Sequence, residues 1–107
     1  MVNPEPFSER RKAPRYLFRV DVEIELGSRV LRVPISDISF GGMFIRTTEP
    51  LSIGAEFSAR LLLEEPLWVY CVVRQVVSKQ GMGVQFLDLT DSSRATFENL
   101  LSKLAEQ

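Results

Sequence analysis

The stretch FRVDVEIELGSRVLRVPISDI, residues 18–38, decides the fold of this chain. Between Phe18 and Leu26 every second residue is apolar, and the residues between them are Arg, Asp and Glu. This period of two predicts a strand with one buried face. Gly27-Ser28 then supplies a two-residue turn, and residues 29–38 are again rich in apolar side chains. The spacing therefore predicts a β-hairpin.

Four further segments have the character of short strands, and turn residues separate them. They are residues 43–46, 56–63, 67–77 and 82–87. β-Branched and aromatic side chains dominate residues 67–77, as is typical of a strand. Six short strands at regular spacing favour an antiparallel β-barrel over residues 16–88, because closure removes the exposed edges of a small sheet.

The last part of the chain changes its apolar period from that of a strand to that of a helix. Thr90–Ser93 contain N-cap candidates, and Phe97 and the three leucines after it share one helical face. These features predict one amphipathic helix over residues 91–105. The expected fold class is therefore all-β with a C-terminal helix.

Length and composition fit one folded domain. The chain has 107 residues, of which 45% are hydrophobic and 25% charged. We expect residues 1–9 to form a flexible segment and residues 10–107 to form the domain. No apolar stretch approaches the roughly 18 residues that cross a bilayer, and one cysteine cannot form an internal disulfide. We expect a cytoplasmic protein without membrane insertion.

Two absences argue against catalysis. The sequence contains no histidine, which removes the usual general base near neutral pH and the commonest zinc ligand. The single cysteine, Cys71, lies within an apolar run, where burial as a small hydrophobic residue is the better interpretation. We therefore expect no enzyme, no catalytic residue and no metal site.

Basic charge gathers near the N-terminus. Residues 10–19 hold five Lys and Arg and no acidic residue, although the net charge of the whole chain is −1. Such a block is most often a solvated arm, but it can also bind an anion. A long nucleic acid would require a broad basic face, so a small anionic ligand fits this local block better.

Arginine dominates the basic block, and Arg11 and Arg15 form an Arg-x-x-x-Arg pattern. Because Pro14 disfavours helical backbone at the residue before it, we expect residues 10–15 to form a bent arm that can fold over a ligand. A guanidinium suits this role, since it pairs through two hydrogen bonds with phosphate or with the O6/N7 edge of guanine.

The second candidate site is the hexapeptide DISFGG, residues 37–42, at the end of a predicted strand. Its aspartate can accept hydrogen bonds from the N1–H and N2–H₂ edge of guanine, and its serine and glycine N–H groups can hold a phosphate. Alone, such a hexapeptide is more often an ordinary serine-stabilised loop. It is not a hydrolase nucleophile elbow, which needs a glycine where Asp37 stands.

Together the two motifs resemble the PilZ domain family, receptors for the bacterial second messenger cyclic di-GMP. Arg11 and Arg15 match the family's Arg-x-x-x-Arg pattern, and Asp37, Ser39 and Gly42 match its Asp/Asn-x-Ser-x-x-Gly pattern. The resemblance covers essentially the whole folded chain.

The resemblance implies a six-stranded, PilZ-like split barrel and a receptor rather than an enzyme. In the family the arginine arm closes over the ligand, the aspartate reads a guanine and the serine supports the ligand on the barrel. The implied cyclic di-GMP site consists of Arg10, Arg11, Arg15, Asp37, Ser39, Gly41 and Gly42. The first of these matches a position that bears on whether one ligand or an intercalated pair is bound.

A single-domain receptor is expected to signal through an effector protein, as a monomer or weak homodimer. One alternative is an interaction adaptor of the same fold with little or no nucleotide binding. Another is an oligonucleotide-binding barrel, which would expose several aromatic side chains for base stacking. Against it, we expect four phenylalanines to point inward, namely Phe18, Phe44, Phe57 and Phe86.

Overall fold

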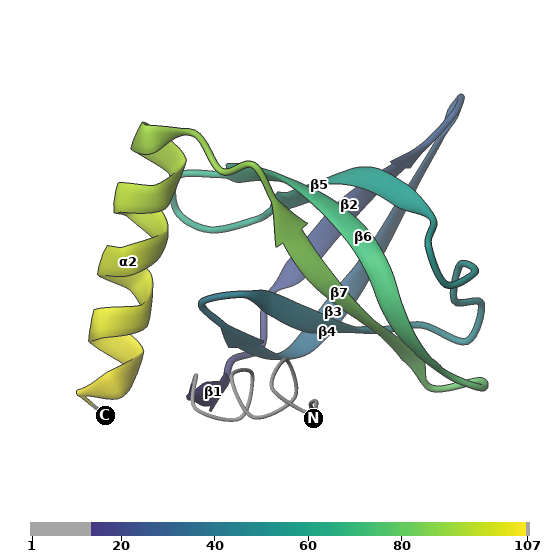
Figure 1. The fold of residues 1–107 in the computed structure, drawn as a ribbon, viewed down its shortest axis with the longest axis horizontal. Helices are drawn as coiled ribbons and strands as arrows, with labels where there is room; N and C mark the ends of the chain where they lie inside the picture. The colour runs from purple at the N-terminus through teal and green to yellow at the C-terminus, as the bar shows by residue number, and fades with distance from the viewer. Residues whose placement is uncertain (1–13, 107) are drawn as a thin grey trace, which may run out of the picture.

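The computed structural model describes residues 14–106, so the predicted segment 1–9 and most of the predicted arm 10–15 lie outside the described residues. The described part contains seven strands and one helix (Figure 1). They are β1 (Arg15–Leu17), β2 (Asp21–Leu26), β3 (Arg29–Ser39), β4 (Gly42–Arg46), β5 (Glu56–Leu61), β6 (Leu67–Val77), β7 (Gly81–Leu87) and α2 (Asp91–Ala105).

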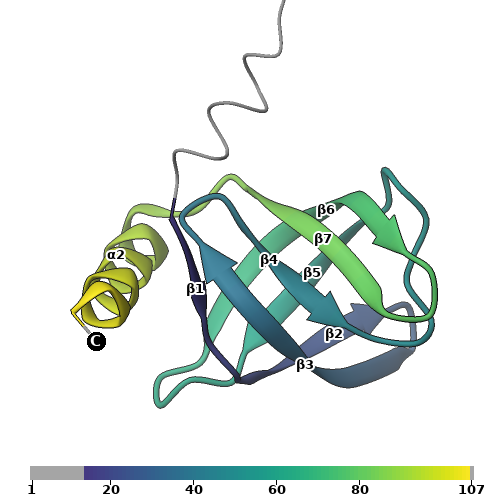
Figure 2. The same ribbon diagram turned by 90° about the horizontal axis from the view of Figure 1, so that it is seen from below.

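Six of the strands form a closed antiparallel barrel in the order β3-β2-β5-β6-β7-β4, and pairing of β3 with β4 completes the circle. This confirms the predicted six-stranded barrel. β1 is an additional strand, and among the strands of residues 14–106 it pairs with β3 alone; Figure 2 shows it along the side of the barrel between β3 and α2.

The strand predicted over residues 18–26 is shorter than expected, because residues 18–20 have no regular strand structure and β2 begins only at Asp21. Phe18 still donates its N–H to the Ser36 carbonyl at 3.2 Å, and the Val20 carbonyl accepts from Ile35 N at 2.9 Å. The segment therefore stays beside β3, and both β1 and β2 pair with the same edge of this long strand. The alternation of apolar residues is unbroken across residues 18–20 and gives no sign of the interruption.

The core fills the barrel interior with the inward side chains of the strands. Phe57 and Phe86 are buried as predicted, and Phe18 is partly buried against the core. The prediction for Phe44 is wrong: its neighbours on β4 are buried, whereas Phe44 lies opposite Gly83 and is half-buried. Its ring occupies space that a Cβ atom at Gly81 would need, so glycines on β7 accommodate an outward-facing aromatic side chain.

Helix α2 has the predicted bounds and stands at one end of the barrel (Figure 1). Thr90 is its N-cap, because the Thr90 hydroxyl accepts a hydrogen bond from Ser93 N at 3.1 Å. Phe97 is fully buried, and its ring meets that of Phe86 edge-to-face at 4.9 Å between centroids. An aromatic contact therefore fastens the helix to β7.

Candidate functional site

Strand β1 brings one residue of each predicted motif together. Arg15 lies opposite Ser39 in the antiparallel register, and its side chain reaches the neighbouring Asp37. Arg15 Nε and Nη2 both donate to Asp37 Oδ1, at 3.0 and 2.5 Å. Two residues that are 22 positions apart in the sequence therefore form an ion pair on the barrel surface.

The other carboxylate oxygen of Asp37 accepts a hydrogen bond from the Ser36 hydroxyl at 3.2 Å. In the pairing of β3 with β4 the register shifts between Ile35 and Asp37, and this irregularity sets the direction of the side chains beside it. The Asp37 side chain is 25% exposed and that of Arg15 is 49% exposed. Solvent, and therefore a ligand, can reach both groups.

Ser39 acts within the turn that joins β3 to β4. It is buried, and its hydroxyl accepts from Gly41 N at 3.3 Å and donates to the Gly42 carbonyl at 3.4 Å. Both bonds are internal to the motif, so the hydroxyl shapes the turn. The serine thereby fixes the backbone that follows Asp37.

The two glycines at the end of the hexapeptide, Gly41 and Gly42, are held in place by different contacts. A Cβ atom at Gly42 would stand 2.1 Å from the carbonyl oxygen of Val84 on β7, so β4 and β7 can approach only with glycine there. A Cβ atom at Gly41 would meet nothing within 4 Å. Gly41 is instead held through its carbonyl, which accepts from Phe86 N at 2.8 Å.

The structure therefore brings together five of the seven predicted site residues, namely Arg15, Asp37, Ser39, Gly41 and Gly42. The predicted Arg10 and Arg11 lie outside the described residues. The sequence motifs do not include Ser36, although its hydroxyl donates to the motif carboxylate. No pattern in the sequence marks this contact, since it depends on the register shift in β3.

Other arginines of the barrel bond to partners outside this group, although Gln85, the partner of Arg74, lies opposite Gly42 in the sheet. Arg32 bonds to Asp21 at 3.3 Å, and Arg74 Nε donates to Gln85 Oε1 at 2.8 Å. A hollow of about 250 Å³ beside Arg46 lies at the opposite end of β4 from Gly42 and includes none of the motif residues. These cations are not gathered at the candidate site.

The predicted burial of Cys71 is confirmed. It is fully buried, and burial raises the pKa of its thiol to about 12.

Residues 14–106 contain no group of three or more His, Cys, Asp or Glu side chains that could hold a metal ion. Within the same residues, no helix has the length and apolar character needed to span a membrane.

Comparison with known families finds one that matches most of the chain. Residues 9–103 match the PilZ domain. The chain belongs to the PilZ domain family. The match includes both predicted motifs, and the barrel with its C-terminal helix is the architecture that the sequence resemblance implied. No curated protein matches this PilZ domain.

Solved structures share the fold at low sequence identity. The PilZ domain of YcgR from Escherichia coli, solved with c-di-GMP, superposes with a TM-score of 0.75 at 16% identity, over 91% of this chain and 92% of that one. The K. pneumonia MrkH–c-di-GMP complex gives 0.77 at 24% identity, over 90% and 52% of the two chains. The Bacillus subtilis inhibitor of motility MotI/DgrA gives 0.71 at 22%, over 91% and 50%. This PilZ domain thus spans about half the length of the last two proteins.

Proposed function

We propose that this PilZ domain is a cyclic di-GMP receptor that passes the signal to an effector protein. The ligand site consists of Arg10, Arg11, Arg15, Asp37, Ser39, Gly41 and Gly42, and residues 10–107 are the ligand-binding unit. Family membership supports this function, as do the structural relatives solved with c-di-GMP.

The ion pair between Arg15 and Asp37 is the observation on which the proposal rests. The carboxylate suits the N1–H and N2–H₂ donors of a guanine, and the guanidinium suits a phosphate or the guanine O6/N7 edge. Arg15 already donates twice to Asp37 Oδ1. Ligand binding therefore exchanges this ion pair for contacts from each partner to the nucleotide.

The same exchange would order the arm. Arg15 is the last arginine of residues 10–15 and is paired with Asp37, and Arg10 and Arg11 precede it closely in the sequence. A ligand held at Asp37 would therefore recruit their guanidinium groups as well. We propose that residues 10–15 close over the ligand and that the closed arm forms a surface an effector recognises. Arg10 is expected to contact a second guanine, which would give two ligands per chain.

Calorimetric titration of the full chain with cyclic di-GMP tests the proposal. Arg15→Ala and Asp37→Ala are each expected to weaken binding about tenfold to a hundredfold, because each removes hydrogen bonds to guanine or phosphate. Arg60→Ala is the matched control, since Arg60 forms a similar ion pair with Glu23 on β2 and β5, at 2.6 Å. Its affinity is expected to equal that of the wild type.

Two results would contradict the proposal. Absence of binding by the wild-type chain at tens of micromolar ligand would leave the adaptor without nucleotide binding as the better interpretation. Unchanged affinity in both Arg15→Ala and Asp37→Ala would mean that the ligand binds elsewhere on the barrel.

A further inference from the structure

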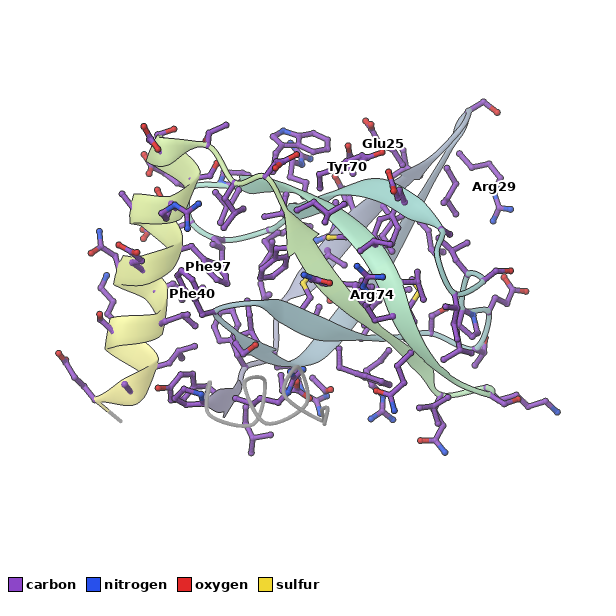
Figure 3. The ribbon with its side chains drawn as sticks, in the orientation of Figure 1. Glu25, Arg29, Phe40, Tyr70, Arg74 and Phe97 are labelled. Carbon is purple, nitrogen blue, oxygen red and sulfur yellow. The ribbon has the colours of Figure 1, made fainter. Side chains whose placement is uncertain are left out.

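The turn that carries the candidate site also contacts the C-terminal helix. Phe40 lies between Ser39 and Gly41 and is 44% exposed. Its ring centroid is 6.2 Å from that of Phe97, the fully buried residue of α2. Figure 3 shows the two side chains next to each other, between the end of the barrel and the helix. One residue of the motif thus reaches α2 directly.

A second connection runs through the backbone. The Gly41 carbonyl accepts a hydrogen bond from Phe86 N at 2.8 Å, and the Phe86 ring meets the Phe97 ring at 4.9 Å. The side-chain contact and the backbone contact therefore converge on Phe97. Any change in the turn alters the surroundings of the one α2 residue that is fully buried.

The turn has one sterically fixed end, at Gly42, and a corner at Phe40 and Gly41 with open space beside it. Gly42 is fixed because β7 leaves no room for a Cβ atom, whereas the space around Gly41 is open. The Ser39 hydroxyl holds the corner through two long hydrogen bonds, of 3.3 and 3.4 Å. Besides these two bonds, the corner is held by the Gly41 carbonyl, which accepts from Phe86 N at 2.8 Å, and by the contact of Phe40 with Phe97. A shift of the corner therefore changes its contacts with Phe86 and Phe97.

We propose that Phe40 is a positioning residue that couples occupancy of the ligand site to the packing of α2. The coupling rests on the proposed function, since it describes how a ligand in the proposed site affects α2. A ligand on Asp37 favours one arrangement of the corner, and the Phe40 ring transmits it to Phe97. The helix is then the element whose state differs between free and bound protein.

Hydrogen exchange of the α2 amides in the full chain, with and without saturating cyclic di-GMP, tests the coupling. Exchange in α2 is expected to change on binding in the wild type. Phe40→Ala is expected to bind within about threefold of wild-type affinity, because Phe40 is outside the proposed contacts, and to show a smaller change in α2, because only the connection through Phe86 remains. Phe40→Tyr keeps the ring and is expected to keep the response.

Ile53→Ala is the matched control. Ile53 is an exposed apolar side chain in the connection between β4 and β5, which Figure 1 shows at the opposite end of the barrel from α2. This variant removes apolar surface without touching the aromatic contact. Its ligand affinity and its α2 response are both expected to match the wild type.

A second measurement tests the coupling in the opposite direction, from α2 to the ligand site. If the site and the helix are coupled, Phe97→Leu must change ligand affinity, and the effect must depend on Phe40. Side chains in contact typically couple by at least about twofold in an equilibrium constant. Phe97→Leu is therefore expected to change affinity at least about twofold in the wild type and by less in Phe40→Ala.

The outcomes separate this coupling from the function on which it rests. Binding without any change in α2, or an unchanged α2 response in Phe40→Ala, overturns the coupling and leaves the receptor function standing. Absence of binding by the wild type overturns both.

Discussion

At the scale of single residues, Gly42 and Gly41 have opposite steric surroundings. A Cβ atom at Gly42 would overlap the Val84 carbonyl, and one at Gly41 would project into open space. The Asp/Asn-x-Ser-x-x-Gly pattern includes Gly42 but not Gly41. Its place in the pattern therefore has a structural cause, the close approach of β4 to β7.

Gly42→Ala is expected to lower the free energy of unfolding by about 1–3 kcal/mol or more, because the added methyl group forces β4 away from β7. Gly41→Ala is expected to change it by less than about 1 kcal/mol in either direction. Urea denaturation of both variants measures the difference. Equal destabilisation would contradict the contact geometry.

Cys71 is expected to make the protein sensitive to alkaline pH. Burial raises the pKa of its thiol to about 12, whereas a thiol in the unfolded chain ionises near pH 8.5. The unfolded state therefore loses its proton first. The stability contribution of Cys71 is complete below about pH 8.5 and declines as pH rises towards 12, by up to about 1.4 kcal/mol per pH unit.

Urea unfolding of the wild type and Cys71→Ala, from pH 7.5 to 10.5, measures this contribution. The variant is expected to be less stable at neutral pH, because a buried side chain is shortened, but to lose stability less steeply above pH 8.5. Tyr70, whose pKa is raised chiefly by its hydrogen bond to Glu56, is present in both proteins and cancels in the comparison. Parallel curves would contradict the assignment.

The identity of the residues in the candidate site was easier to predict from the sequence than their contacts. Asp37 and Arg15 were selected by motif and are in contact. The Ser39 hydroxyl is confined to the turn by local bonds to Gly41 N and the Gly42 carbonyl, as in a serine-stabilised loop. The partnership of Ser36 with the carboxylate instead accompanies the register shift in β3. Register is set by pairing between strands, which a pattern of residue types along one strand does not specify.

At the scale of elements, boundaries were predictable where turn residues or a change of period mark them. Strand β6 and helix α2 have the predicted ends. The break before β2 was not predictable, because its cause is the length of β3, which pairs along one edge with two separate strands. The outward Phe44 was missed for a related reason, since glycines on the partner strand decide that its face can hold an aromatic ring.

The N-cap of α2 offers a test at this scale. Thr90→Ala removes the hydroxyl that accepts from Ser93 N, and is expected to cost about 1 kcal/mol of stability. Thr90→Ser keeps an acceptor at the same position and is expected to recover most of the loss. Ser102→Ala, on the exposed side of the same helix, is the control for removal of a hydroxyl. Urea denaturation of the three variants measures the effect, and equal stability of Thr90→Ala and Ser102→Ala would contradict it.

At the scale of the whole molecule, basic residues are concentrated in one stretch of an otherwise acidic sequence, and Arg15 of the candidate site belongs to that stretch. Five basic residues and no acidic one fall within residues 10–19, although the net charge is −1. β1 joins this block to the barrel beside Asp37. Composition alone indicated an unremarkable domain, and only the position of the charges pointed to an anionic ligand.

Ligand binding to the folded state is expected to raise the melting temperature. At free cyclic di-GMP one hundred times its dissociation constant, the folded state gains about 2.7 kcal/mol. For a domain of this size that corresponds to a shift on the order of 10–20 °C. Thermal denaturation followed by circular dichroism measures the shift. Asp37→Ala at the same ligand concentration is expected to shift less, and an equal shift would contradict the proposed site.

The closed barrel also constrains the order in which the chain can fold. β4 is sealed by β7, a strand much later in the sequence, and β3 is paired on both edges only when β4 is in place. A ribosome that has released only β1 to β6 has therefore exposed a sheet whose last neighbour is still missing. Folding must wait for Gly81–Leu87, and until then the open edges of β4 and β6 are available to chaperones or to other chains.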